Sequence, residues 1–239
     1  MTVPNQVLNK FPKISNDQLL HNLSNPVGKN KLIIDTDTAN EIDDQFALAW
    51  ALLSEDKIDL LGVTAEPYSF QHHQEELLEA YNIINENKDI SKDKINLVNN
   101  YRDWVNGLID INKHPNDIYF DTPEEGVEKS YQEIIKIFDK LNMPYEGKVF
   151  RGSYQYLSSF DEPLITESSK FIVDSCLSYP NEKIYVCAIG CLTNIASALL
   201  MEPKIINNLV VVWTSGFPTH SINNNTNSLN LVQDVLSSQ

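Results

Sequence analysis

The chain has 239 residues, of which 42% are hydrophobic and 21% charged, a composition typical of a folded globular protein. Its 18 basic and 33 acidic side chains give a net charge of −15, which argues against binding to nucleic acid or to an anionic membrane surface. The N-terminal segment lacks the pattern of a secretory signal, and no apolar run approaches the roughly 20 residues that span a bilayer. We therefore expect a cytoplasmic protein.

Strand-like and helix-like segments alternate along the chain. Apolar, β-branched runs predict strands at residues 31–35, 58–65, 95–98, 147–152, 183–190 and 208–216. Helical periodicity predicts helices at 43–53, 71–85, 126–141, after Pro163 and at 193–200, whereas 99–125 reads as an irregular excursion. The alternation is typical of an α/β fold with an open, mainly parallel, Rossmann-like sheet and helices on both faces. With no repeat or Pro/Gly-rich linker, we expect one domain over residues 1–239.

An acidic loop follows the first predicted strand, and it contains Asp35, Asp37, Glu41, Asp43 and Asp44. Ligands bind such sheets outside the carboxyl ends of the strands, so this loop lies where a site is expected. Strand alternation places Asp35 and Asp37 on the same side. Consecutive helical residues diverge by about 100°, so only one of Asp43 and Asp44 can face those acids. Trp50, on the following helix, and Trp213, in a later strand, are expected in the core.

Two interpretations of this loop remain open on these residues alone. Clustered carboxylates repel one another unless a cation lies between them, and an all-oxygen ligand set suits Ca²⁺ or Mg²⁺. Alternatively, Asp43 or Asp44 caps a helix and the other acids are solvated, because acidic residues favour helix N-termini. The position of the loop at the end of a buried strand favours a metal site.

Three segments, in order along the chain, resemble the nucleoside hydrolase family of the inosine/uridine-preferring type. They are IIDTDTANEIDDQFALAWAL (33–52), IGCLTNIASALLMEPKI (189–205), and VVVWTSG followed by SLNLVQDV. The first is similar to the family signature in which a strand ends in D-x-D and a helix opens with D-D. Its five intervening residues resemble those of a divergent N-E-x-D-D branch of the family. The second is similar to the G-P-L-T-N loop, and the third to the E-F-N segment that contacts ribose.

The resemblance implies a Ca²⁺-dependent hydrolase that splits ribonucleosides into ribose and free base, in purine and pyrimidine salvage. The metal ligands would be Asp37, Asp44 and the Thr193 backbone carbonyl, with Asp37 also acting as the base. Asp43 and Asn230 would bind ribose hydroxyls, and Asp35 would orient the ligands. Asn40 and Glu41 fall inside the site loop, where we expect Asn40 to contact substrate and Glu41 to support the ligands. From its loop over the expected site, His220 is the candidate for contacting the nucleobase.

The chain departs from the family pattern at several positions. Ser69 stands where the family usually has a ribose-binding Asn, Ser228 where it has Glu, and the late His-Asp pair is absent from the sequence. These departures favour an alternative, a non-catalytic relative that binds ribose or metal. A phosphatase-like enzyme that uses the D-x-D acids is a third hypothesis. The resemblance also implies a further C-terminal part after the helix expected from residue 229, so apolar surface left uncovered would lower stability or promote homo-oligomers.

Overall fold

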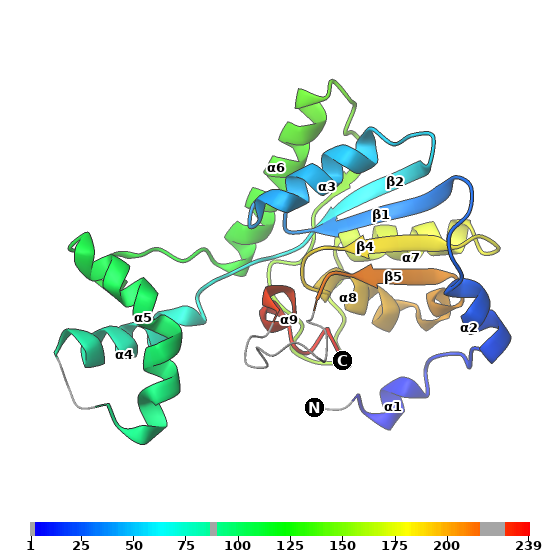
Figure 1. The fold of residues 1–239 in the computed structure, drawn as a ribbon. Helices are drawn as coiled ribbons and strands as arrows, with labels where there is room; N and C mark the ends of the chain where they lie inside the picture. The colour runs from blue at the N-terminus through cyan, green and yellow to red at the C-terminus, as the bar shows by residue number, and fades with distance from the viewer. Residues whose placement is uncertain (1–2, 87–89, 216–227) are drawn as a thin grey trace. The chain divides into compact units, whose positions relative to one another are not determined.

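The computed structural model describes residues 3–86, 90–215 and 228–239 (Figure 1). By their internal contacts, these residues form two compact units. Unit 1 comprises Met1–Tyr68 with Pro123–Gln239, and unit 2 comprises Ser69–Thr122. Unit 1 begins with two short helices, α1 (Asn5–Leu8) and α2 (Asn16–Asn22). In the described part of the chain, no helix has the length and apolar character needed to cross a membrane.

The centre of unit 1 is an open parallel sheet, as expected from the sequence, and its five strands lie in the order β3-β2-β1-β4-β5. Its strands are β1 (Asn30–Thr36), β2 (Ile58–Ala65), β3 (Val149–Phe150), β4 (Ile184–Ala188) and β5 (Leu209–Trp213). Asp35 on β1 pairs with Thr64 on β2 and with Ala188 on β4. The three central strands therefore end at the same level, and the segments that follow them meet at one edge of the sheet.

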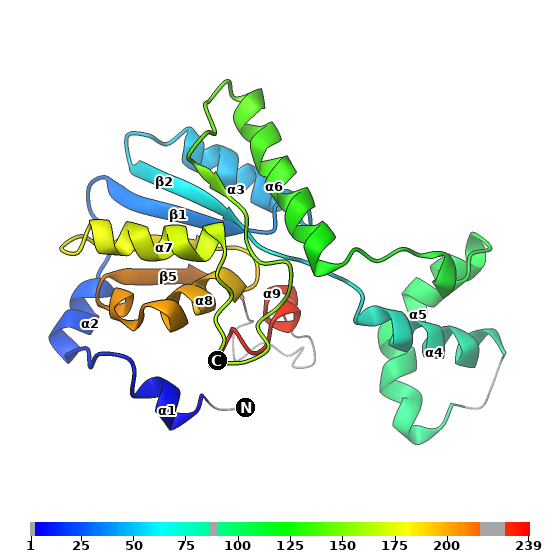
Figure 2. The ribbon, with the colours of Figure 1, turned by 180° about the vertical axis from the view of Figure 1, so that it is seen from behind.

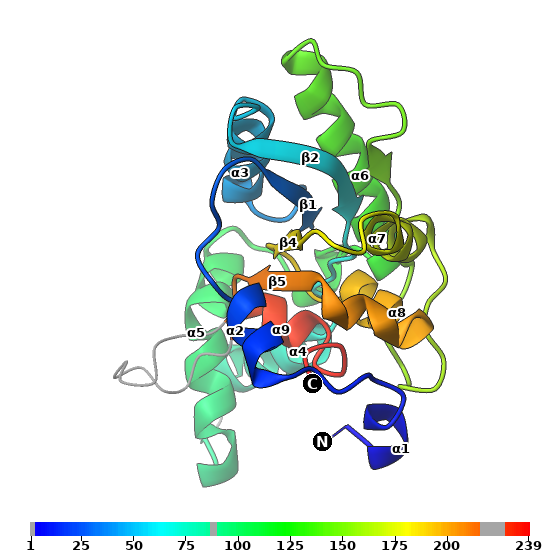
Figure 3. The same cartoon turned by 90° about the vertical axis from the view of Figure 1, so that its right-hand side faces the viewer.

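Helices cover both faces of the sheet, which confirms the predicted architecture (Figure 2). On one face lie α3 (Ile42–Leu52) and α6 (Pro123–Lys140), and on the other α7 (Glu167–Ser178) and α8 (Thr193–Met201). Figure 3 shows these layers from the side. Adjacent strand residues point to opposite faces. Accordingly, Ile33 packs in the cluster with α7 and α8, and Ile34 packs in the cluster with α3 and α6.

Unit 2 is helical, and it corrects two predictions. It contains α4 (His73–Asn85), the 3₁₀ turns η1 (Lys92–Lys94) and η2 (Pro115–Asp117), and α5 (Ile95–Asp110). The expected strand at 95–98 is the first turn of α5, and the expected irregular segment 99–125 contains the rest of that helix. The buried residues of α5 are Val98, Tyr101, Val105 and Leu108. Their spacing of three and four residues is that of one face of a helix.

The environments of the two tryptophans differ. Trp50 was expected in the core, but it is 77% exposed, because it lies on a side of α3 that faces an open groove, which it lines with Ile34, Cys187 and Ile189. Trp213 is half-buried against the cluster beneath α7 and α8, and its indole N–H donates to the Gly190 carbonyl. The chain ends with the 3₁₀ turn η3 (Pro203–Asn207), β5 and the short helix α9 (Leu229–Gln233).

Candidate functional site

Four consecutive residues at the end of β1 are polar and yet buried. Asp35, Thr36, Asp37 and Thr38 are each at most 1% exposed. After Asp37 the chain turns, and the Asn40 backbone N–H donates to the Asp37 carbonyl at 2.7 Å. The Asn40 side-chain amide also donates to Asp37 Oδ2 at 2.9 Å. Asn40 therefore holds one oxygen of the Asp37 carboxyl group in place.

Asp44 joins Asp37 from the first turn of α3. It is buried, and its Oδ2 accepts a 2.6 Å hydrogen bond from the Thr36 hydroxyl. Asp43 is exposed, so only one of the two helical acids faces the strand acids, as the helical geometry predicts. Burial, followed by the charge of Asp44, raises the pKa of Asp37 well above its ordinary value. Burial raises the pKa of Asp44 to about 6, an effect opposed by the hydrogen bond from Thr36.

Asp35 lies in a second buried carboxyl pair, with Glu66. The Oδ1 of Asp35 accepts from the Thr64 hydroxyl at 2.5 Å and from the Asn194 side-chain amide at 3.0 Å. Glu66 directly follows β2, is fully buried and accepts the Asn194 backbone N–H at 2.8 Å. Burial, followed by the charge of Asp35, raises the pKa of Glu66 well above its ordinary value. Asn194 thus links the ends of β1 and β2.

The turn between β4 and α8 lies directly against Asp37. A Cβ atom on Gly190 would stand 3.1 Å from Asp37 Oδ1 and 3.2 Å from the Asp37 backbone nitrogen, so this approach leaves little room for a side chain. Thr193 is the first residue of α8 and is fully buried. Its hydroxyl donates to Asp234 Oδ2 at 2.7 Å. The turn that carries Thr193 is therefore held between Asp37 and the C-terminal segment.

Asn230, on α9, lies at the ends of β4 and β5. Its side-chain amide donates to the carbonyls of Ile189 and Thr214, both at 2.9 Å, which uses both of its amide hydrogens. Its Oδ1 is buried and has no hydrogen-bond partner within the ranges that the structure describes. Only this oxygen is left to contact a ligand, so Asn230 can accept a hydrogen bond but not donate one from its side chain.

The structure places the sequence-predicted residues in three groups. The residues gathered at the carboxyl ends of the central strands are Asp35, Asp37, Asp44, Thr193 and Asn230, with Asn40 bonded to Asp37. At the start of α3, Glu41 is half-buried and Asp43 exposed. Burial, followed by the charge of Asp43, raises the pKa of Glu41. His220 lies outside the described residues. The roles expected for these residues remain predictions.

Sequence reasoning missed Glu66, Asn194 and Asp234. Tyr156 was open to two interpretations from the sequence, a ring that stacks on a planar base or a residue packed at the edge of the site. The Tyr156 hydroxyl donates to the side-chain oxygen of Gln233. Burial raises the pKa of Tyr156, and the next contributions come from Cys191 and Asp37, so its ring lies among the site residues. Glu66 carried a usable signal, an acid immediately after a buried strand.

The donor set around Asp37 suits a hard cation. Asp37 Oδ1 is buried and has no hydrogen-bond partner in the part of the chain that the structure describes. Over those same residues, no group of three His, Cys, Asp or Glu side chains could hold a metal ion. A cation there would need ligands besides the two carboxylates, and Ca²⁺ commonly takes backbone carbonyls and water alongside carboxylates. The arrangement therefore fits Ca²⁺ better than a metal that prefers His or Cys.

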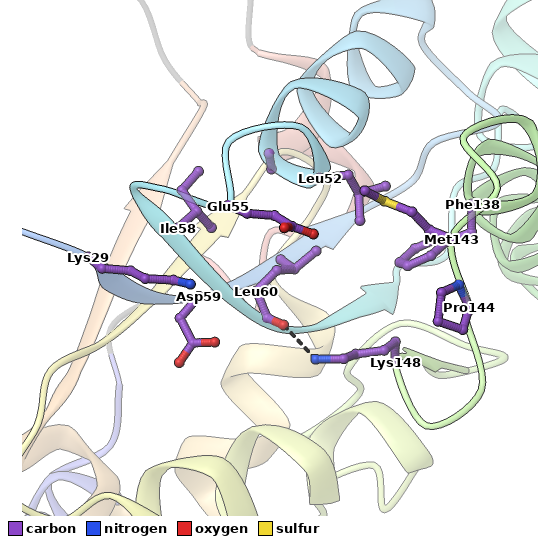
Figure 4. Close-up of a pocket in the computed structure, with 11 residues that line it drawn as sticks. Lys29, Leu52, Glu55, Ile58, Asp59, Leu60, Phe138, Met143, Pro144 and Lys148 are labelled. Carbon is purple, nitrogen blue, oxygen red and sulfur yellow. Dashed lines mark hydrogen bonds between the residues drawn. The ribbon is translucent and has the colours of Figure 1, made fainter.

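A separate pocket lies at the other end of β2 (Figure 4). Ile58 and Leu60 line it from the start of that strand, together with Lys29 and Lys148. Lys148 Nζ donates to the Leu60 carbonyl at 2.8 Å. None of the lining residues belongs to the acidic cluster, so this pocket is distinct from the candidate site.

Comparisons with known proteins agree with the fold. A sequence model described as inosine-uridine preferring nucleoside hydrolase matches residues 32–237. The purine-preferring ribonucleoside hydrolase from Gardnerella vaginalis matches 87% of this chain and 56% of its own, with 21% identity and a TM-score of 0.50. A plant nucleoside hydrolase matches 87% of this chain and 55% of its own, with 17% identity and a TM-score of 0.48.

The inosine-uridine preferring nucleoside hydrolase from Bacillus anthracis matches 87% of this chain and 60% of its own, with 18% identity and a TM-score of 0.44. This chain therefore spans less than two thirds of the length of each of the three structures. A comparison with curated proteins found no significant match.

Proposed function

The chain belongs to the inosine-uridine preferring nucleoside hydrolase family, and from this premise we propose that it hydrolyses the N-glycosidic bond of ribonucleosides, releasing ribose and free base. The observation that carries the proposal is the buried Asp37–Asp44 pair, in which Asp37 Oδ1 has no hydrogen-bond partner in the described ranges. The charge of Asp44 raises the pKa of Asp37, and a cation between the two carboxyl groups would stabilise both in their charged form. We assign that role to Ca²⁺.

Asp37, Asp44 and the Thr193 backbone carbonyl would hold the ion. Bound Ca²⁺ supplies the positive charge that orients a water molecule for attack on the sugar. Because Ca²⁺ acidifies water only weakly, a protein carboxylate has to take the proton, and we assign this to Asp37. Asn40 holds Asp37 Oδ2, which leaves Oδ1 for ligands.

The remaining groups bind and stabilise the sugar. As the C1′–N bond breaks, its electron pair leaves with the base, and positive charge develops on the ribosyl ring. Carboxylates at the site stabilise that charge. The water oxygen would bond to C1′ as one of its protons passes to Asp37, and the departing base would take up a proton from solvent. Asp43 and Asn230 Oδ1 would accept hydrogen bonds from ribose hydroxyls. The Asp43 carboxylate has no hydrogen to donate, and both amide hydrogens of Asn230 are already bonded to backbone carbonyls.

The test is release of reducing sugar from a panel of purine and pyrimidine ribonucleosides by the Ca²⁺-loaded chain. We expect Asp37→Asn to lower the rate by about 10²-fold or more, since loss of a general base commonly costs that much. Asp59→Asn is the matched control, because Asp59 lies at the start of β2, away from the site. A folded chain that binds ribose but releases none from any nucleoside would establish the non-catalytic alternative. A trapped phospho-aspartate would establish the phosphatase-like one.

A further inference from the structure

Glu66 contacts both ends of the Cys191–Asn194 turn, which leads from the residues after β4 into the start of α8. Its Oε1 accepts the Asn194 backbone N–H at 2.8 Å, and its Oε2 accepts from the Cys191 thiol at 3.4 Å. Thr193 lies between these two contacts. The carboxyl group therefore spans the short segment whose carbonyl is assigned to the ion, although 128 positions separate Glu66 from Asn194 in the chain.

Asn194 extends this connection to the neighbouring strand ends. Its side-chain amide donates to Asp35 Oδ1 and to the Ala65 carbonyl, both at 3.0 Å. Gly152 packs so closely here that a Cβ atom would stand 2.0 Å from the Ala65 carbonyl oxygen and 2.8 Å from Asn194 Oδ1. The turn is thus held by hydrogen bonds on one side and by backbone packing on the other, with little room to shift.

Burying a carboxyl group costs free energy unless its hydrogen bonds are made inside the protein. Among the residues that the structure describes, Glu66 meets that condition through the turn and the neighbouring Asp35, so its place in the fold is explained by what it holds. We propose that Glu66 is a positioning residue, which fixes the Cys191–Asn194 turn, and with it the Thr193 carbonyl, against Asp37. The part of this inference that concerns Ca²⁺ rests on the proposed function, whereas the part that concerns the geometry of the turn does not.

The experiment compares Glu66→Ala, Glu66→Gln and Asn208→Ala in the full chain. The raised pKa of Glu66 makes the neutral amide its conservative replacement, because Gln keeps an acceptor for the Asn194 N–H. Asn208 is the matched control. It is a buried polar residue at the opposite end of β5, and its side-chain amide donates to the carbonyls of Cys176, Tyr179 and Glu182. Its loss lowers stability without touching the turn.

Two readouts are measured, hydrogen exchange of the backbone amides at 191–196 and Ca²⁺ affinity by calorimetry. We expect Glu66→Ala to lose protection at these amides and to bind Ca²⁺ about 10- to 100-fold more weakly, the usual cost of losing a residue that orients metal ligands. Glu66→Gln should retain most of both properties. Asn208→Ala should leave both unchanged at temperatures where it is folded.

The inference is overturned if Glu66→Ala and Asn208→Ala give the same exchange at 191–196, or if Glu66→Ala loosens the turn and leaves Ca²⁺ affinity unchanged. Absence of Ca²⁺ binding by the unmodified chain would contradict the proposed function instead. In that case, the exchange comparison alone decides whether Glu66 positions the turn.

Discussion

The Thr36 hydroxyl donates a 2.6 Å hydrogen bond to Asp44 Oδ2 and so ties the last residue of β1 to the first turn of α3. The Thr38 hydroxyl lies 2.8 Å from that of Thr36. Because Thr36 uses its hydrogen on Asp44, Thr38 is the donor in this second contact. The chain of two hydroxyls holds Asp44 toward Asp37 and leaves Asp43 in solvent.

Replacing Thr36 with Val should destabilise the protein. The substitution keeps the shape of the side chain and removes the donor to Asp44, and a hydrogen bond to a charged group contributes about 1.5–3 kcal/mol. Urea denaturation should therefore show a lower free energy of unfolding for Thr36→Val than for Thr36→Ser, which keeps the hydroxyl. Equal stability of the two variants would show that the bond does not hold Asp44.

Ca²⁺ binding should release protons. The folded-state pKa of Asp44 is raised to about 6 from an ordinary 3.8, and that of Asp37 is raised as well. Between pH 3.8 and about 6, Asp44 is more protonated in the metal-free folded state than in the unfolded state. The stability of the metal-free fold therefore falls as pH rises through this range. Affinity for Ca²⁺ should rise over the same range as the carboxyls ionise. Calorimetry in buffers of different ionisation enthalpy measures the release, and a pH-independent affinity would contradict this prediction.

Gly190→Ala should weaken Ca²⁺ binding. The added Cβ would lie 3.1 Å from Asp37 Oδ1, so the turn or the carboxyl has to shift. We expect roughly a tenfold loss of affinity, the low end of the effect of disturbing ligand orientation. Gly107→Ala is the control, because Gly107 lies within α5 and a Cβ there meets nothing within 4 Å. It should leave affinity unchanged and raise stability by up to about 1 kcal/mol. Unchanged affinity in Gly190→Ala would show that the turn tolerates a side chain beside Asp37.

The two sides of α3 should respond differently to substitution. Leu48 is fully buried in the core beneath the helix, and Leu48→Ala should cost about 2–5 kcal/mol in unfolding free energy. Phe46 is 70% exposed, and Phe46→Gln should change stability by less than about 0.5 kcal/mol. Thermal and urea unfolding of the pair test this orientation of the helix. A similar cost for both would mean that the outer side of α3 is covered in solution.

Most of the sheet could be predicted from the sequence because its strands are apolar, β-branched runs, and the carboxyl halves of β1 and β2 are buried on both faces. The run at 58–65 is apolar and bounded by polar residues, and β2 has the same limits. The strand predicted at 95–98 was wrong because a short apolar run fits either a strand or a buried turn of helix. The spacing of Tyr101, Val105 and Leu108 indicates a helix, but this spacing becomes visible only over a longer window of sequence.

The site was predictable where its residues are close in sequence. Asp37 and Asp44 share one loop, and strand and helix periodicity are enough to bring them together. Glu66 and Asn194 could not be assigned in this way. Each has its partner far away in the chain, because the two residues that bond to each other are 128 positions apart. Such contacts are set by strand order and helix packing, which local patterns do not specify.

The central claim, that the buried Asp37–Asp44 pair binds a divalent cation, is tested most directly by calorimetric titration of the metal-stripped chain with Ca²⁺. We predict saturable binding of one ion at millimolar concentration or below, within the range of protein Ca²⁺ sites. Asp44→Ala should abolish this binding with the fold retained by circular dichroism, and Asp43→Asn, at the exposed neighbouring position, should keep it. A folded chain without saturable binding, or equal loss in both variants, would contradict the account.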